Sequence, residues 1–206
     1  EAERLAKDRL IEEQEDARAL VQGQALFGDV LLNKLASPEW KERKEAIVAI
    51  QHATEEHGIE TAALWGTEPG LSSEGFDDMR IRFVVVCSIV KHALKGRVAL
   101  VCFAAFDALN TALNAYVAYF NKTTQEVGGA LQRLVPLLIE KMDGKGTDDS
   151  PRAVAARALT CIMHLADATA VGGQHLIAPF LSQETLPACP RLRLQKDFRE
   201  KFGLNK

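Results

Sequence analysis

One stretch decides the fold: Ser37-Pro38-Glu39-Trp40-Lys41-Glu42-Arg43-Lys44-Glu45-Ala46-Ile47-Val48-Ala49-Ile50. Ser37 is a favourable N-cap residue, and Pro38 suits the first helical position because no N–H donor is needed there. The apolar residues of the segment from Ala46 to Ile50 recur at helical spacing. The stretch therefore predicts a helix that begins at Pro38, with an aromatic and basic first turn around Trp40.

The composition is that of an ordinary globular protein. The chain has 206 residues, of which 47% are hydrophobic and 26% charged, and its formal net charge is −3. A chain of this length can bury a sizeable core, and its near-neutral charge gives no sign of a nucleic-acid partner. Charges interrupt the apolar segments before they reach the roughly 20 residues that span a bilayer, so we expect no membrane partner. The four cysteines, Cys87, Cys102, Cys161 and Cys189, are widely spaced, which is typical of reduced thiols in a cytoplasmic protein.

Helical patterns cover most of the chain and are joined by short turns. After a charged helix in residues 1–22, apolar periodicity predicts helices over residues 26–35, 38–57, 76–94, 98–119, 127–142, 151–168, 174–181 and 192–202. Gly58 is expected to end the helix over residues 38–57. We assign residues 1–24 to a charged helix or linker, and residues 25–206 to one helical domain.

The charged N-terminal helix has a thin apolar stripe, and two interpretations of it remain open. The stripe either packs on the body of the domain or continues a coiled coil that precedes the chain. It consists of Leu5, Leu10, Ala17, Leu20 and Val21.

A weak internal repeat relates the predicted helices. Residues 43–50 align with residues 152–159 at an arginine, two alanines and a final aliphatic residue, and residues 105–109 fit the same frame. Helix pairs that recur in this way indicate a stacked helical array. The predicted fold class is all-α, an α-solenoid of HEAT-type antiparallel helix pairs.

The turns inside the predicted pairs carry basic residues. Such turns lie along one edge of a solenoid, so a chain of negative net charge would present a basic edge to an acidic partner. A tryptophan flanked by Arg and Lys has the composition of an interface hot spot. Two plainer readings stay open: basic residues are common in loops, and Trp40 could fold back onto the preceding helix. The candidate residues are Trp40, Lys41, Arg43, Lys44, Lys95, Arg97, Val98, Lys145, Arg152, Arg191 and Arg193.

No motif indicates catalysis, a metal or a cofactor. The run Gly144-Lys145-Gly146-Thr147 lacks the spacing of a phosphate-binding loop. Cys161 and His164 are one helical turn apart, but no second pair with ligand spacing accompanies them. No nucleophile triad or carboxylate pair stands out from helix-surface charge. We therefore expect a non-enzymatic protein without a metal or cofactor.

Residues 27–50 resemble the first HEAT repeat of a TOG domain, a tubulin-binding HEAT-repeat array. The resemblance is carried by Phe27-Gly28-Asp29-Val30-Leu31-Leu32-Asn33-Lys34-Leu35 followed by Ser-Pro-Glu-Trp-Lys-Glu-Arg-Lys-Glu-Ala. In that family, a tryptophan in the first intra-repeat turn marks the tubulin-binding edge. The Phe-Gly-Asp start and the long apolar second pair are similar to a branch that acts at ciliary tips and carries a single TOG domain after a helical segment.

The resemblance implies binding of soluble, curved αβ-tubulin through the turn edge and regulation of microtubule ends at centrioles or cilia, where other centriolar or ciliary proteins would be further partners. It makes Trp40 the first-turn anchor, with Lys41 and Arg43 or Lys44 beside it. It assigns Val98, Lys95 and Arg97 to the second turn, Lys145 and Arg152 to the third, and Arg191 and Arg193 to the fourth. The chain departs from six-repeat TOG domains because only about four pairs fit, and Asp148 and Asp149 make the third turn acidic.

Two other functions stay open at this stage. A generic HEAT or armadillo adaptor would bind a peptide or helix in a concave groove, lined by residues such as Asn110, Asn114 and Gln132. A structural piece of a larger scaffold would use the N-terminal helix for dimerisation.

Overall fold

The structure is a computed structural model that describes residues 2–65, 73–142, 150–181 and 200–202. Within these ranges the chain is helical and contains no strand, which confirms the all-α fold class. The helices are α1 (Ala2–Phe27), α2 (Asp29–Leu35), α3 (Trp40–Trp65), α4 (Ser73–Lys95), α5 (Ala99–Tyr119), α6 (Gln125–Met142), α7 (Pro151–Asp167) and α8 (Gln174–Ile177), with 3-10 turns at Thr169–Val171 and Ala178–Phe180.

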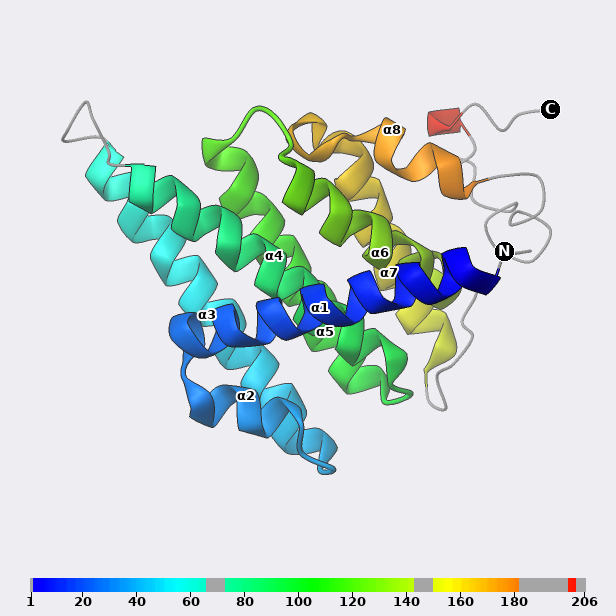
Figure 1. Ribbon diagram of the computed structural model, residues 1–206, viewed down its shortest axis with the longest axis horizontal. Helices are drawn as coiled ribbons and strands as arrows, with labels where there is room; N and C mark the ends of the chain where they lie inside the picture. Colours follow the sequence, from blue (N-terminus) through cyan, green and yellow to red (C-terminus); the bar gives the residue numbers. More distant parts are fainter. Residues whose placement is uncertain (1, 66–72, 143–149, 182–199, 203–206) are drawn as a thin grey trace.

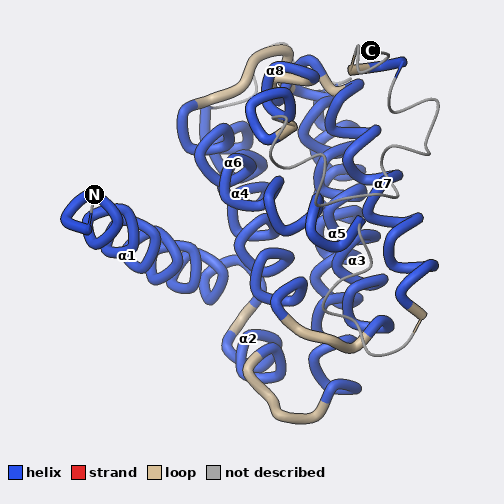
Figure 2. The backbone as a smooth tube through the Cα atoms, turned by 90° about the vertical axis from the view of Figure 1, so that its right-hand side faces the viewer, coloured by secondary structure: helices blue, strands red, loops and turns tan. Residues whose placement is uncertain are grey.

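The helices α2 to α7 form two layers. One layer holds α2, α4 and α6, and the other holds α3, α5 and α7 (Figure 2). Within the second layer, α5 packs against both α3 and α7, while α4 contacts α5 and α6. The α2–α3 turn, the α4–α5 turn and the start of α7 lie along one edge of the molecule, the lower edge in Figure 1. We call this the turn edge.

Helix α5 is the centre of the core. Of its 21 residues, 11 are buried, and they face α3, α4 and α7. Among the described helices, α5 is the one that is long and apolar enough to cross a membrane by length and composition. A helix that is apolar on all sides also suits the middle of a helical protein, which is where α5 lies.

Gly58 does not end α3, which was expected to stop there and instead continues to Trp65. A Cβ atom on Gly58 would lie 3.4 Å from the Cβ of Ala115, so this glycine allows α3 and α5 to approach closely. The Tyr119 hydroxyl of α5 also donates a 2.7 Å hydrogen bond to the Gly58 carbonyl. Gly58 therefore allows α3 and α5 to pack closely and does not end a helix.

The start of α3 also differs from the sequence prediction. The Glu39 carbonyl accepts the first helical hydrogen bond, from the Arg43 N–H at 3.3 Å, so α3 begins at Trp40 rather than at Pro38. The Ser37 hydroxyl accepts a 3.1 Å bond from the Glu39 N–H and closes the turn before the helix. At the other predicted Ser-Pro start, Pro151 does open α7.

Burial corrects the repeat alignment by one residue. The sequence comparison matched Ala46 to Ala155, whereas the buried pattern of α3 matches that of α7 when Ala46 is paired with Val154. The buried residues in register are Ala46, Ile47 and Ile50 in α3, and Val154, Ala155 and Ala158 in α7.

Helix α1 is continuous through the predicted boundary near residue 24 and ends at Phe27. Gly28 follows with φ of 81°, a conformation that favours glycine, and separates α1 from α2. The helix crosses the layer of α4 and α6 on the outside (Figures 1 and 2).

The face of α1 that packs on the body is acidic. Its members at the interface include Glu12, Glu15 and Asp16, and Ala19 is buried there. The predicted apolar stripe is not the buried face of α1, because its described members Leu10, Ala17, Leu20 and Val21 are exposed.

Candidate functional site

Trp40 opens α3 at the turn edge. Its side chain is half-buried and packs against the hydrophobic core, so it is less exposed than the sequence suggested. The ammonium nitrogen of Lys41 lies 5.9 Å from the centre of the Trp40 ring, within reach of a cation–π interaction. Lys41 itself is exposed, whereas Lys44 is half-buried. This first turn thus presents one exposed cation beside a partly covered aromatic ring.

Arg43 points into the α2–α3 turn. Its Nη1 atom donates hydrogen bonds to the Ser37 carbonyl at 2.7 Å and to the Pro38 carbonyl at 2.8 Å. These carbonyls follow the C-terminal end of α2, where the helix dipole favours a positive charge. Arg43 therefore fixes the shape of the turn, a role that its place among the candidate contacts did not suggest.

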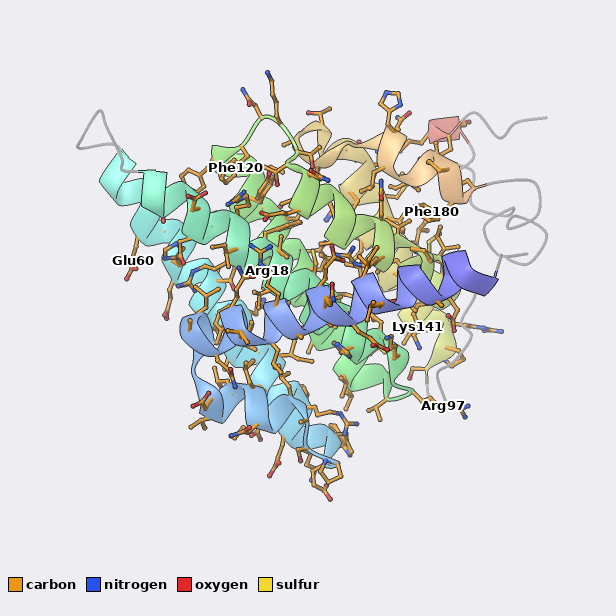
Figure 3. The ribbon with its side chains drawn as sticks, viewed as in Figure 1. Arg18, Glu60, Arg97, Phe120, Lys141 and Phe180 are labelled. Atoms are coloured by element: carbon orange, nitrogen blue, oxygen red, sulfur yellow. The ribbon has the colours of Figure 1, made fainter. Side chains whose placement is uncertain are left out.

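The α4–α5 turn carries the second group of candidates. Lys95 and Arg97 are exposed, and Val98 is the half-buried residue that precedes α5 and packs on the core. Lys141 of α6, labelled with Arg97 in Figure 3, donates a 3.0 Å hydrogen bond to the Gly96 carbonyl of this turn. Lys141 is buried, and its role could not be predicted because in the sequence it resembles any other charged residue at a helix end.

The remaining candidates belong to the third and fourth turns. Arg152 is exposed in the first turn of α7, at the turn edge. Lys145, Arg191 and Arg193 lie outside the described residues. The structure therefore brings three described groups of basic residues to one edge: Lys41 with Lys44, Lys95 with Arg97, and Arg152.

A cleft of about 620 Å³ lies beside the turn edge, between α1, α2, α3 and α4. Its walls include Ala36, Ser37 and Arg43 at the first turn, and Gly96 and Val98 at the second. Most of the other lining residues are apolar: Ala17, Ala19, Leu20, Leu32, Leu35, Ile47, Val85, Ile89, Ala93 and Val101. A mostly apolar cleft of this size with a few polar groups is typical of a binding site. Sequence reasoning did not anticipate it.

The lining of the cleft comes from segments that are far apart in the sequence. Helix α1 contributes Ala17 and Ala19, the first turns of α3 contribute Arg43 and Ile47, and the remaining residues come mainly from α2 and α4.

A buried lysine of α4 binds α1 beside this cleft. Lys91 of α4 is only 4% exposed, and its ammonium nitrogen donates to Glu12 at 2.9 Å and to both carboxylate oxygens of Asp16 at 2.7 Å. The hydrogen bond from Lys91 holds the pKa of Glu12 below its ordinary value, against the opposing effect of burial. The Ser88 hydroxyl also donates to Asp16, at 3.3 Å.

Further ion pairs extend this contact along α1. Arg133 of α6 pairs with Glu15, and Arg18 lies 3.6 Å from Glu126. The Asp16 carboxylate is also 3.6 Å from His92, whose pKa is lowered mainly by burial. Helix α1 is thus held mainly by charge.

The other chemical candidates have structural partners. Cys161 is buried with its sulfur 3.8 Å from the Phe106 carbonyl, and burial raises the pKa of its thiol to about 12. His164 instead lies 3.3 Å from the amide oxygen of Asn110. In residues 2–65, 73–142, 150–181 and 200–202, no three His, Cys, Asp or Glu side chains gather as a metal site would require.

His57 has an acidic partner that the sequence did not reveal. Its Nε2 atom lies 2.9 Å from Asp78 of α4, and Asp78 also accepts a 2.8 Å hydrogen bond from Arg82. Burial, followed by the charge of Arg82, lowers the pKa of His57, while Asp78 acts in the opposite direction. Through the contact of His57 with Asp78, these three side chains connect α3 to α4.

The residues named for a concave groove lie in different layers. Asn110 and Asn114 belong to α5, while Gln132 belongs to α6 in the other layer. Asn110 is half-buried, and the other two are exposed.

No protein family, curated protein or solved structure gives a significant match to this chain.

Proposed function

We propose that the chain is a HEAT-type helical array of the TOG class that binds αβ-tubulin through its turn edge, without catalysis. The observation that carries this proposal is the recurrence of exposed cations at three turns along one edge of a protein with a net charge of −3, the first of which also exposes Glu39 and Glu42. Lys41, Lys95, Arg97 and Arg152 come from three separate parts of the chain and meet at that edge.

The arrangement of the helices supports the HEAT-type part of the proposal. The pairs α2/α3, α4/α5 and α6/α7 follow one another, and each contributes one helix to each layer. Contacts run from α3 to α5 to α7 and from α4 to α6. Stacked helix pairs with nearest-neighbour contacts are the defining feature of such arrays.

Electrostatics explains how the turn edge would recognise tubulin, an acidic partner. Exposed cations steer an acidic surface and raise its association rate, and salt weakens this effect. The half-buried Trp40 would then provide an apolar contact beside Lys41. Arg43 would contribute indirectly, by fixing the turn that presents both residues.

The proposed cellular role follows the resemblance. The protein would act on microtubule ends in the cytoskeleton, at the centriole or the tip of the cilium, where other centriolar or ciliary proteins would be further partners.

Charge reversal tests the proposal without disturbing the core. The double variant Lys41→Glu, Lys95→Glu changes two exposed residues on two turns, so we expect the affinity for αβ-tubulin to fall at least about tenfold. Lys122→Glu is the matched control because Lys122 is exposed on the α5–α6 turn, at the opposite end of α5. Equal affinities of the wild type and the double variant, measured by titration with labelled tubulin, would refute the turn-edge site.

Trp40→Ala tests the aromatic contact separately. We expect it to weaken tubulin binding by at least about 2 kcal/mol, the loss typical of a hot-spot residue. Because Trp40 also packs on the core, the free energy of unfolding of the variant must be measured beside its affinity. An unchanged affinity in a folded variant would remove Trp40 from the site.

A further inference from the structure

The cleft of about 620 Å³ opens between the two turns that carry the proposed tubulin contacts. Val98, one of those contacts, is part of its wall, and Gly96 joins it to the exposed Lys95 and Arg97. On the other side, Ser37 and Arg43 line the cleft next to Trp40. A partner surface lying on the turn edge would therefore cover the cleft.

The cleft is apolar inside and basic on its turn side. Leu32, Ile47 and Val101 line the interior. Of the charged lining residues, Asp16 shares the ammonium group of Lys91 with Glu12, so the α1 side of the cleft keeps a negative charge. On the turn side, Arg43 donates its hydrogen bonds to uncharged carbonyls and keeps its positive charge. The exposed Lys95 lies beside the cleft wall formed by Gly96.

We propose that this cleft receives an apolar side chain from an acidic segment of the partner that binds the turn edge. The occupant is an aliphatic or aromatic side chain flanked by carboxylates: the side chain enters between the α2–α3 turn and the α4–α5 turn, and the carboxylates face Arg43 and Lys95. This inference rests on the proposed binding of tubulin and adds an apolar subsite to it.

Filling the cleft from two of its walls tests the inference. Ala93→Phe places a ring in the cleft from α4, and Ala17→Phe does so from α1, where the native alanine is exposed. Neither substitution removes a cation of the turn edge. We expect each variant to bind αβ-tubulin about tenfold more weakly than the wild type, because displacing a buried anchor residue abolishes a hot-spot contact. Ala156→Phe, at an exposed position of α7, is the matched control.

A small apolar anion, 1-anilinonaphthalene-8-sulfonate, probes the cleft without tubulin. Its fluorescence should rise with the wild type and with Ala156→Phe, and both cleft-filling variants should lose this rise while keeping the wild-type circular dichroism. If folded cleft-filling variants bind tubulin as tightly as Ala156→Phe does, the apolar subsite is refuted, but the proposed binding of tubulin to the turn edge is not. If the wild type does not bind tubulin at all, the proposed function fails and the subsite fails with it.

Discussion

Helix α1 and helix α5 are held in the molecule by opposite kinds of interaction. α5 contributes 11 buried residues and lies between α3, α4 and α7. The described interface of α1 instead buries Ala19 and Gly23 and depends on carboxylates that meet Lys91 and Arg133. Burial therefore stabilises the bundle, whereas charge positions the helix that borders the cleft.

The largest effect should come from the centre of the bundle. Phe106 is 1% exposed in α5, so Phe106→Ala removes a buried ring and should cost about 3–5 kcal/mol of unfolding free energy. Leu100→Ala is the control on the same helix, because Leu100 is 41% exposed and should matter little. Urea unfolding measures both variants. A loss below about 1 kcal/mol for Phe106→Ala would contradict the burial of α5.

The next effect concerns the charges that hold α1. The double variant Glu12→Gln, Asp16→Asn leaves the buried Lys91 without a carboxylate. The free energy that holds α1 on the body should fall by more than about 2 kcal/mol. The ammonium group regains water when α1 leaves the body, so we expect α1 to undock before the bundle unfolds. Hydrogen exchange of the α1 amides should accelerate, and Glu13→Gln, at an exposed position of α1, should leave it unchanged. Unaltered protection of α1 in the double variant would show that charge does not hold the helix.

A smaller effect should follow from the close approach of α1 to α2 and α4. A Cβ atom on Gly23 would lie 3.2 Å from Cγ1 of Val85 and 3.3 Å from Cδ1 of Leu32, so there is little room for a side chain. Gly23→Val should therefore cost about 1–3 kcal/mol through overpacking. At Gly128 the nearest atom is 3.8 Å away, and Gly128→Val is the control for the change in helix propensity. Equal thermal stability of the two variants would contradict the close approach of α1 to α2 and α4.

The smallest effect should be a pH dependence within the bundle. Burial and Arg82 lower the pKa of His57 despite Asp78 and Glu60, so the unfolded chain takes up this proton at a higher pH than the folded one. Stability should therefore be unaffected by this group well above the ordinary histidine pKa and should fall as the pH drops below it. His57→Gln should flatten this slope in urea unfolding at a series of pH values. If the unfolding free energy of the variant changes with pH as steeply as that of the wild type, other groups cause the pH dependence.

The sequence predicted the helices better than it predicted how they pack. Pro151 and the apolar pattern placed α5, α6 and α7 close to their observed bounds, because local chemistry determines them. Gly58 looked like a helix end because its contact with Ala115 comes from a distant part of the chain. The inward face of α1 was missed for the same reason: Lys91, which attracts the acidic face, belongs to α4.

The candidate site was predictable in position but not in detail. Basic residues in short turns indicated a common edge, and Lys41, Lys95 and Arg97 lie on it. The inward role of Arg43 depends on where the carbonyls of the α2–α3 turn point, which residue type alone does not reveal. The cleft is lined by residues of α1, α2, α3 and α4 that only the packing of the helices brings together, so no local motif could predict it.

We propose that the basic turn edge binds tubulin, and size-exclusion chromatography with αβ-tubulin can show whether it does. The wild type and the Lys122→Glu control should co-elute with tubulin at low salt, whereas the Lys41→Glu, Lys95→Glu variant should elute separately. Separate elution of a folded wild type, or co-elution of all three proteins, would rule out tubulin binding at the turn edge.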